Sequence, residues 1–213
     1  NKSDAEKKLI EFANKYENTE GVLVQRSNEW IKNVSFTVGG SEVAAVIGWN
    51  KYKSRDNVVA DKVKCRFGLR DKGEAACWWG TIFEEVVARF IEIKYQTKIY
   101  IDEICINSGV YKNMRYSPDG VCVIINDRSE VVTCLIEIKT PFNRIPSGEI
   151  PIDYLPQVLT GLDIISNEGL KLDYGLFVDC CLKMSVFEER GVCSGYSGYH
   201  KRGPGKTTIP IAC

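Results

Sequence analysis

Residues 117–139 read SPDGVCVIINDRSEVVTCLIEIK, and this stretch decides the fold. Two apolar runs rich in β-branched residues flank the polar segment 126–130, which predicts a β-hairpin with a five-residue turn. The register set by this turn places Asp119 opposite Glu137, and Cβ atoms of opposed residues lie roughly 4.5–5.5 Å apart. Lys139 follows Glu137 by two residues, so it points to the same face.

The charged residues of this hairpin predict a site for a divalent cation. Two carboxylates this close repel each other unless a proton or a cation lies between them. Glu137 and Lys139 also interrupt an otherwise apolar strand, where charges are costly unless they are paired or bind a metal. Mg²⁺ prefers oxygen ligands of this kind. A plain Asp-Gly turn with a solvated strand face is the alternative that these residues alone leave open.

The chain has 213 residues and a formal net charge of zero. This length suits one domain over residues 1–213, with a core at about 28–182 and a mobile basic tail at 191–213. Because the whole chain is neutral, a nucleic-acid site must be a local patch. Segment 51–72 offers one, since eight cationic and three anionic side chains give it a net charge of +5. The candidate DNA contacts are Lys51, Lys53, Arg55 and Arg144.

Cysteine and histidine usage limits the kinds of site and compartment. The nine cysteines are odd in number and most lie in apolar runs, and no secretory signal is visible, so we expect reduced thiols in an intracellular protein. The lone His200 argues against a Ser–His–Asp triad or a zinc site with several histidines. No apolar run approaches the roughly 20 residues of a membrane span.

The remaining pattern predicts an α/β fold with a mixed central sheet flanked by helices. We expect helices at residues 4–17, 75–95 and 153–166, and strands near residues 99–106 and 172–182. In the longest helix, six apolar residues fall on one face that we expect to meet the core: Ile82, Phe83, Val86, Val87, Phe90 and Ile93. Glu84 lies at the border of that face, whereas Glu85 lies on the polar face.

A further helix is expected at residues 42–47, after Gly39-Gly40-Ser41, with Ser41 as its N-cap. Such a helix start offers free backbone N–H groups and a positive dipole end to a phosphate. A plain N-cap without a ligand is the alternative.

Five stretches in this order resemble the PD-(D/E)xK nucleases, and more closely the lambda-type, YqaJ-like viral recombinase exonucleases. The resemblance covers roughly residues 28–180 and is strongest to the versions from large cytoplasmic DNA viruses. The matching stretches are Val38–Gly48, Trp79–Glu84, Ser117–Gly120, Leu135–Phe142 and Tyr154–Gln157.

The resemblance implies a metal-dependent DNA nuclease, acting 5′→3′ on duplex ends in viral recombination, repair or processing. It implies Asp119, Glu137 and the backbone carbonyl of Ile138 as ligands of Mg²⁺ or Mn²⁺, with two ions per site. Glu84 would support the second ion or its waters, and Lys139 would position or deprotonate the attacking water. The implied phosphate contacts are Ser41, Ser117 and Gln157.

The resemblance also implies partners and leaves rival functions. It implies a single-strand annealing protein as partner, assembly into a ring trimer, and a location in the host cytoplasm or at a viral replication site. The family has an arginine that holds the terminal phosphate. This chain has Val34 at that position, and Lys32 is the candidate substitute. The rivals are an endonuclease acting on DNA or RNA, an inactive nucleic-acid-binding module, and an iron–sulfur nuclease using Cys180, Cys181 and Cys193 with an earlier cysteine.

Overall fold

The computed structural model describes residues 1–17, 23–24, 27–69, 75–101, 104–141, 144–182, 185–187, 193–195 and 211–212. The elements in chain order are α1 (Lys2–Glu17), β1 (Leu23–Val24), α2 (Asn28–Val34), β2 (Val38–Gly39), α3 (Gly40–Val46), α4 (Arg55–Arg66), α5 (Ala75–Tyr95), β3 (Ile104–Asn107), β4 (Met114–Tyr116), β5 (Gly120–Ile125), β6 (Val131–Lys139), α6 (Leu155–Asn167), β7 (Tyr174–Asp179), β8 (Ser185–Phe187), β9 (Cys193–Gly195) and β10 (Ile211–Ala212).

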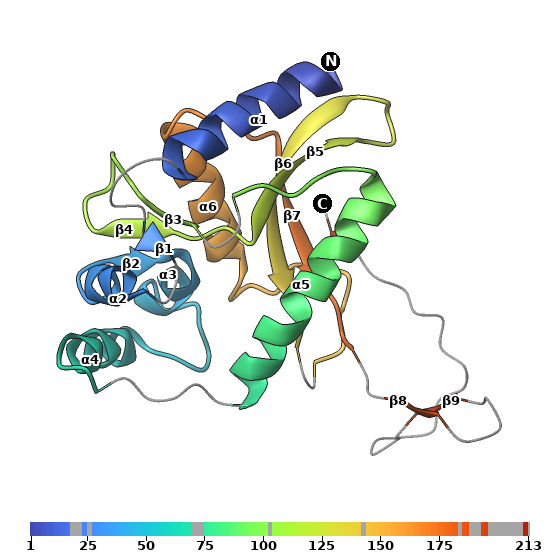
Figure 1. Cartoon of the computed structure of the whole chain (residues 1–213). Helices are drawn as coiled ribbons and strands as arrows, with labels where there is room; N and C mark the ends of the chain where they lie inside the picture. The colour runs from blue at the N-terminus through green and yellow to red at the C-terminus, as the bar shows by residue number, and fades with distance from the viewer. Residues whose placement is uncertain are drawn as a thin grey trace.

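The predicted hairpin lies in the main sheet (Figure 1). The register runs from Gly120 paired with Ile136 to Ile125 paired with Val131, as the five-residue turn predicts. Strand β7 pairs parallel with β6 on the other side, and the strand order is β10-β7-β6-β5. The sheet is therefore mixed, and β6 is flanked on both sides.

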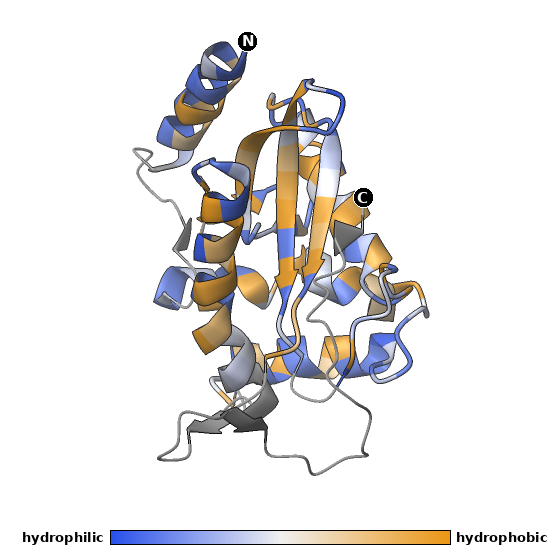
Figure 2. Ribbon diagram, turned by 90° about the vertical axis from the view of Figure 1, so that its right-hand side faces the viewer, coloured by the Kyte–Doolittle hydropathy of each residue, from blue (hydrophilic) through white to orange (hydrophobic). Residues whose placement is uncertain are grey.

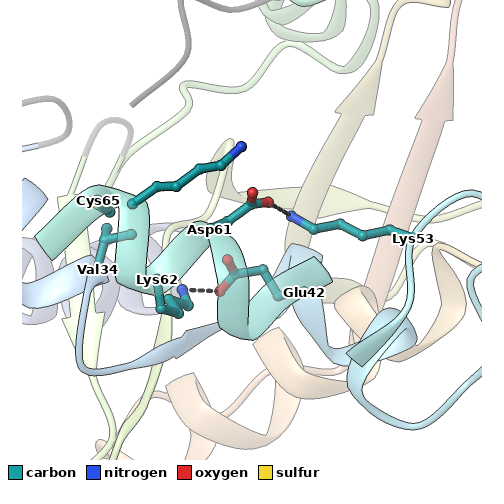
Figure 3. Close-up of a pocket in the computed structure, with 7 residues that line it drawn as sticks. Val34, Glu42, Lys53, Asp61, Lys62 and Cys65 are labelled. Carbon is teal, nitrogen blue, oxygen red and sulfur yellow. Dashed lines mark hydrogen bonds and ion pairs between the residues drawn. The ribbon is translucent and has the colours of Figure 1, made fainter. Parts of the chain in front are cut away.

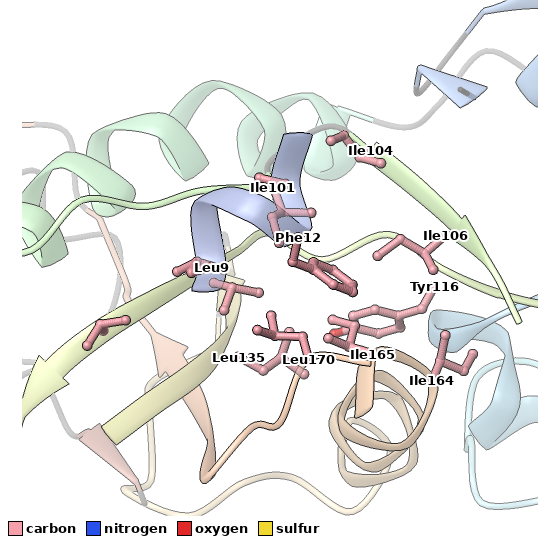
Figure 4. Close-up of a cluster of buried hydrophobic side chains, with 13 residues drawn as sticks. Leu9, Phe12, Ile101, Ile104, Ile106, Tyr116, Leu135, Ile164, Ile165 and Leu170 are labelled. Atoms are coloured by element: carbon pink, nitrogen blue, oxygen red, sulfur yellow. The ribbon is translucent and has the colours of Figure 1, made fainter. Parts of the chain in front are cut away.

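Both faces of this sheet are covered by helices. Helices α1 and α6 pack on one face, where Leu9 and Ile164 join a buried apolar cluster (Figure 4). Helix α5 packs on the other face, where Val87 and Ile91 meet apolar side chains of β5, β6 and β7. Burial on two faces explains why the central strands are apolar along most of their length (Figure 2). No helix among the described residues is both long and apolar enough to cross a membrane.

The core-facing side of α5 differs from the expected one. Val87 is buried as expected, but Ile82, Val86, Phe90 and Ile93 are exposed, so their assignment to the core was wrong. The helix carries apolar residues in two directions, and helical periodicity alone could not say which direction meets the sheet. Only contact with the strands decides it.

A smaller sheet, in the order β1-β3-β4-β2, lies beside the main sheet and brings the chain to the site. Strand β4 pairs antiparallel with β3 and parallel with β2, and β4 leads through Ser117 and Pro118 to Asp119. Of the tail predicted at 191–213, only β9 and β10 fall within the described residues. Strand β10 pairs antiparallel with β7 at the edge of the main sheet.

Candidate active site

Asp119 lies between β4 and β5, and the glycine that follows it shapes this position. Gly120 has a φ of 156°, and a Cβ atom there would lie 2.2 Å from Cγ2 of Ile99, so glycine alone fits. Oδ2 of Asp119 accepts a hydrogen bond from the backbone N–H of Ile138 at 2.6 Å. The carboxylate is thereby tied to β6.

Glu137 is a fully buried carboxylate near the end of β6, with an exposed fraction of 0%. Oε1 accepts hydrogen bonds from Nζ of Lys139 and from the side-chain amide of Gln157 on α6. Oε2 accepts a hydrogen bond from the hydroxyl of Tyr116 at 2.6 Å. Both oxygens are thus satisfied inside the protein, as a buried charge requires.

Lys139 lies between the two carboxylates, as the alternation of the strand predicts. Besides its bond to Glu137, Nζ lies 3.2 Å from the backbone oxygen of Ile138 and 4.0 Å from Oδ2 of Asp119. Nζ also lies 5.7 Å from the ring centroid of Tyr154, which favours a cation–π contact. A cation therefore stands where two carboxylates converge.

Burial dominates the electrostatics of this cluster. Loss of solvation raises the pKa of Asp119 to about 7, although Lys139 opposes the shift and Glu84 adds to it. Loss of solvation likewise raises the pKa of Glu137 to about 7 against the effect of Lys139. For Lys139, burial favours the neutral amine, but the two carboxylates outweigh burial and raise its pKa. The lysine is therefore a charged ammonium at neutral pH.

Glu84 approaches this cluster from α5. Its carboxyl group is within hydrogen-bonding reach of Asp119 and contributes to the raised pKa there. Glu84 is half-buried, whereas the neighbouring Glu85 is exposed, as the sequence predicts. Oγ1 of Thr140 donates to the backbone oxygen of Gly80 at 3.2 Å, which connects α5 to the chain just after β6.

These residues fit a hard divalent cation. Asp119, Glu137 and the carbonyl of Ile138 offer oxygen ligands, and a bound cation would relieve the cost of burying two carboxylates. Within the part of the chain that the structure describes, no group of three or more His, Cys, Asp or Glu side chains is arranged to hold a metal ion. The candidate centre therefore consists of two carboxylates and a carbonyl, with Glu84 beside Asp119.

The sequence profile of the YqaJ-like viral recombinase domain matches residues 25–166, which is more than half of the chain. The chain belongs to the YqaJ-like viral recombinase domain family. This confirms the resemblance drawn from the five sequence stretches, and the matched region contains every residue of the cluster described above.

Relatives of this YqaJ-like domain include viral and bacterial proteins. Protein D345L of African swine fever virus (isolate Tick/Malawi/Lil 20-1/1983) is 31% identical over 187 residues, which cover 78% of this chain and 52% of that protein. Protein YqaJ of Bacillus subtilis is 21% identical and covers 71% of this chain and 46% of its own length. The chain thus spans about half the length of these relatives.

A solved structure shares the fold of this YqaJ-like domain. The alkaline exonuclease LHK-Exo from Laribacter hongkongensis is 23% identical with a TM-score of 0.57, and the match covers 79% of this chain and 81% of that one. The same enzyme in complex with dAMP gives a TM-score of 0.55. The likeness confirms the predicted PD-(D/E)xK-like α/β fold.

The three candidate phosphate contacts of the YqaJ-like domain lie in different settings. Gln157 is buried and bonded to Glu137, so it belongs to the carboxylate cluster. Ser117 is half-buried, and its Oγ has no hydrogen-bond partner among the described residues. Ser41 is exposed but does not cap α3, so that expectation was wrong. Gly39 is the N-cap, and its N–H donates to the carboxylate of Glu42 at 2.8 Å.

Among the cationic residues proposed to bind DNA, Lys53 and Arg55 already form contacts within the YqaJ-like domain. Nζ of Lys53 pairs with Asp61 at 2.6 Å, and Nε of Arg55 donates to the backbone oxygen of Val46 at 3.0 Å. Lys51 and Lys32 are exposed. Nζ of Lys51 lies 4.8 Å from the ring centroid of Tyr52.

A cavity of about 270 Å³ lies between α2, α3 and α4 of the domain (Figure 3). Nζ of Lys62 pairs there with Glu42 at 2.5 Å, and Lys53 and Asp61 close another side. Val34, which replaces the expected arginine, is one of the lining residues. The cavity is therefore lined by already paired charges.

The sequence reasoning missed two residues of the site. Tyr116, which donates to Glu137, gave no periodic signal because it ends a three-residue strand. Asp179 could have been found from the sequence, because it is a charged residue at the end of an apolar strand. Glu137, which lies near the end of such a strand, was found by the same pattern. Asp179 pairs in register with Lys139. Its carboxylate accepts hydrogen bonds from Nη1 and Nη2 of Arg144, the second at 2.9 Å from Oδ1. Arg144, a candidate DNA contact, is thus held beside the cluster.

Proposed function

We propose that this domain is a metal-dependent DNA nuclease that hydrolyses phosphodiester bonds, acting 5′→3′ from the ends of duplex DNA. One observation carries the proposal. The carboxylates of Asp119 and Glu137 converge on the ammonium of Lys139 at the end of a buried hairpin. Gathering three charges, one of them on a fully buried side chain, costs free energy, and clusters with such perturbed pKa values are concentrated at functional sites.

The residues take the following roles. Asp119, Glu137 and the carbonyl of Ile138 would hold Mg²⁺ or Mn²⁺, with Glu84 assisting beside Asp119. A bound cation would supply positive charge to the scissile phosphate. Lys139 is a charged ammonium in the metal-free protein, so we assign it to orient the attacking water and to stabilise developing negative charge rather than to remove a proton. Water adds to phosphorus and releases one proton to the solvent, the bond to the 3′ oxygen breaks, and that oxygen takes up one proton from the solvent.

The relatives support DNA ends as the substrate. The protein whose solved fold this chain shares is an alkaline exonuclease, and the family is that of viral recombinases. We therefore propose a role in viral DNA recombination or repair, in one nuclease domain over residues 1–213. An annealing protein and a ring-shaped oligomer remain predictions from the resemblance.

The test is a cleavage assay on four substrates with Mg²⁺ or with a chelator. The substrates are duplex DNA labelled at the 5′ end, duplex DNA labelled at the 3′ end, closed circular DNA and RNA. We expect early release of mononucleotides from the 5′-labelled end, no cleavage of circles or RNA, and no cleavage without metal. Cleavage of circles or RNA would instead favour the endonuclease. Binding of DNA without any cleavage would favour the inactive module.

A further inference from the structure

Tyr116 contacts Oε2 of Glu137, the oxygen that Lys139 and Gln157 do not contact. It ends β4 three residues before Asp119, and its exposed fraction is 1%. Its ring lies among the apolar side chains that α1 and α6 contribute to the core (Figure 4). Only its hydroxyl is polar, and this group donates to Oε2 of Glu137 at 2.6 Å.

The backbone holds the ring of Tyr116 on two sides. A Cβ atom on Gly40 of α3 would lie 2.5 Å from Cδ2 of the ring, and a Cβ atom on Gly161 of α6 would lie 2.3 Å from Cζ. Two helices therefore approach the ring so closely that only glycine fits at each contact. The position of the hydroxyl is consequently set by the packing of α3 and α6, since the ring cannot turn away without moving a helix.

The two oxygens of Glu137 are held by donors of different mobility. Oε2 accepts a hydrogen bond from the hydroxyl of the tightly packed Tyr116. Oε1 accepts hydrogen bonds from the ammonium of Lys139 and the amide of Gln157. Nζ of Lys139 also lies 4.0 Å from Asp119, so Oε1 is the oxygen on the side of Asp119. A lysine on a flexible four-carbon stem gives way to another cation more readily than a buried ring does.

We propose that Tyr116 is a positioning residue that holds Oε2 of Glu137 and so presents Oε1 to the metal shared with Asp119. The inference rests on the proposed function and adds a residue that the resemblance does not assign. Outer hydrogen bonds of this kind orient a metal-binding carboxylate, and their loss typically weakens metal affinity by about 10–100-fold. Lys139 and Gln157 both donate to Oε1, so without Tyr116 no hydrogen bond among the described residues would hold Oε2.

The experiment measures Mn²⁺ binding to the metal-free protein by calorimetry, without DNA. Tyr116→Phe removes the hydroxyl and keeps the ring between the two glycines. We expect its dissociation constant for Mn²⁺ to rise about 10–100-fold with unchanged stoichiometry. Tyr16→Phe is the matched control, because the Tyr16 hydroxyl donates to the carboxylate of Glu168 at 3.1 Å, away from the site. The control should bind Mn²⁺ as the wild type does.

The outcomes separate a positioning role from a structural one. A Tyr116→Phe variant with a lower melting temperature but wild-type Mn²⁺ affinity would overturn the inference and leave the proposed function standing. Wild-type protein that binds no Mn²⁺ would overturn both. If Tyr116→Phe does not fold, 3-fluorotyrosine at position 116 replaces it. The chemical shift of its fluorine resonance should change on addition of Mg²⁺. A chemical shift that stays the same with Mg²⁺ would overturn the inference.

Discussion

The carboxylate of Asp119 accepts a hydrogen bond from the backbone N–H of Ile138 at 2.6 Å. This bond joins the loop before β5 to the strand that carries Glu137 and Lys139. A backbone donor in a central strand keeps its place whether or not a cation is present. Asp119 is therefore oriented toward the cluster in advance, which spares the reorganisation that a mobile ligand would require.

The first prediction concerns the two carboxylates. Asp119→Asn and Glu137→Gln should each lower kcat by at least roughly 10²-fold, because each removes a charge that would hold the cation in the proposed function. Far-ultraviolet circular dichroism should show the wild-type fold. Glu130→Gln, in the exposed turn of the same hairpin, is the control and should cleave normally. Near-wild-type cleavage by either site variant would show that the cluster is not catalytic.

The second prediction is a pH dependence of stability in metal-free buffer. Burial raises the pKa of Asp119 from 3.8, and that of Glu137 from 4.5, to about 7 in the folded protein. Over that range the folded protein binds more protons than the unfolded chain, so stability falls as pH rises. The contribution of these groups is fully present below about pH 4 and is lost as the pH passes about 7.

The measurement compares melting temperatures of the wild type and of an Asp119→Asn/Glu137→Gln double variant across this pH range. The wild type should lose stability relative to the variant as pH rises, because the amides do not titrate. Saturating Mg²⁺ should abolish this relative loss, since a bound cation favours the charged carboxylates. A difference between the two proteins that stays constant with pH would contradict the electrostatic description of the site.

The main hairpin could be predicted because its information is local. The turn at residues 126–130 fixes the register, and the register alone brings Asp119 to Glu137. The contact of Tyr116 with Glu137 could not be predicted in this way. Tyr116 reaches Glu137 only because β4 belongs to a second sheet, and that sheet depends on pairings distant in sequence. The core-facing side of α5 is likewise set by the strands it meets, not by its own pattern.

The third prediction concerns Lys139. Lys139→Met should lower kcat far more than it raises KM for DNA, because the ammonium faces the carboxylates and its proposed role is to stabilise charge that develops during the reaction. Single-turnover cleavage and binding of metal-free protein to labelled duplex separate the two effects. Weakened binding with unchanged turnover would make this lysine a plain phosphate contact.

The fourth prediction uses neighbouring glutamates on α5 as their own control. Glu84→Gln should impair cleavage, because Glu84 is half-buried and lies within hydrogen-bonding reach of Asp119. Glu85→Gln removes the same charge from an exposed position and should cleave as the wild type does. The measurement is the Mg²⁺ dependence of the initial rate for both variants. Equal losses would place the role of α5 elsewhere than at Glu84.

The last prediction concerns whether DNA binds beside α4. Each lost phosphate contact should lower the slope of log K against log salt by about 0.9 on duplex DNA. Replacing Lys51, Lys53 and Arg55 by glutamine should therefore flatten the slope by up to roughly 2.7, while kcat at saturating DNA survives. Lys7→Gln/Lys8→Gln is the control, because both residues are exposed on α1, which covers the main sheet instead.

The ion pair of Lys53 with Asp61 needs a separate arm of this experiment. Replacing the lysine alone leaves Asp61 as an unpaired negative charge, which would repel DNA even if Lys53 never touched a phosphate. A Lys53→Gln/Asp61→Asn double variant keeps the local net charge and removes this effect. A salt slope that falls by about 0.9 in the double variant assigns Lys53 to a phosphate, because counterion release follows direct contacts. An unchanged slope in the double variant and in the triple variant would place the DNA path away from α4.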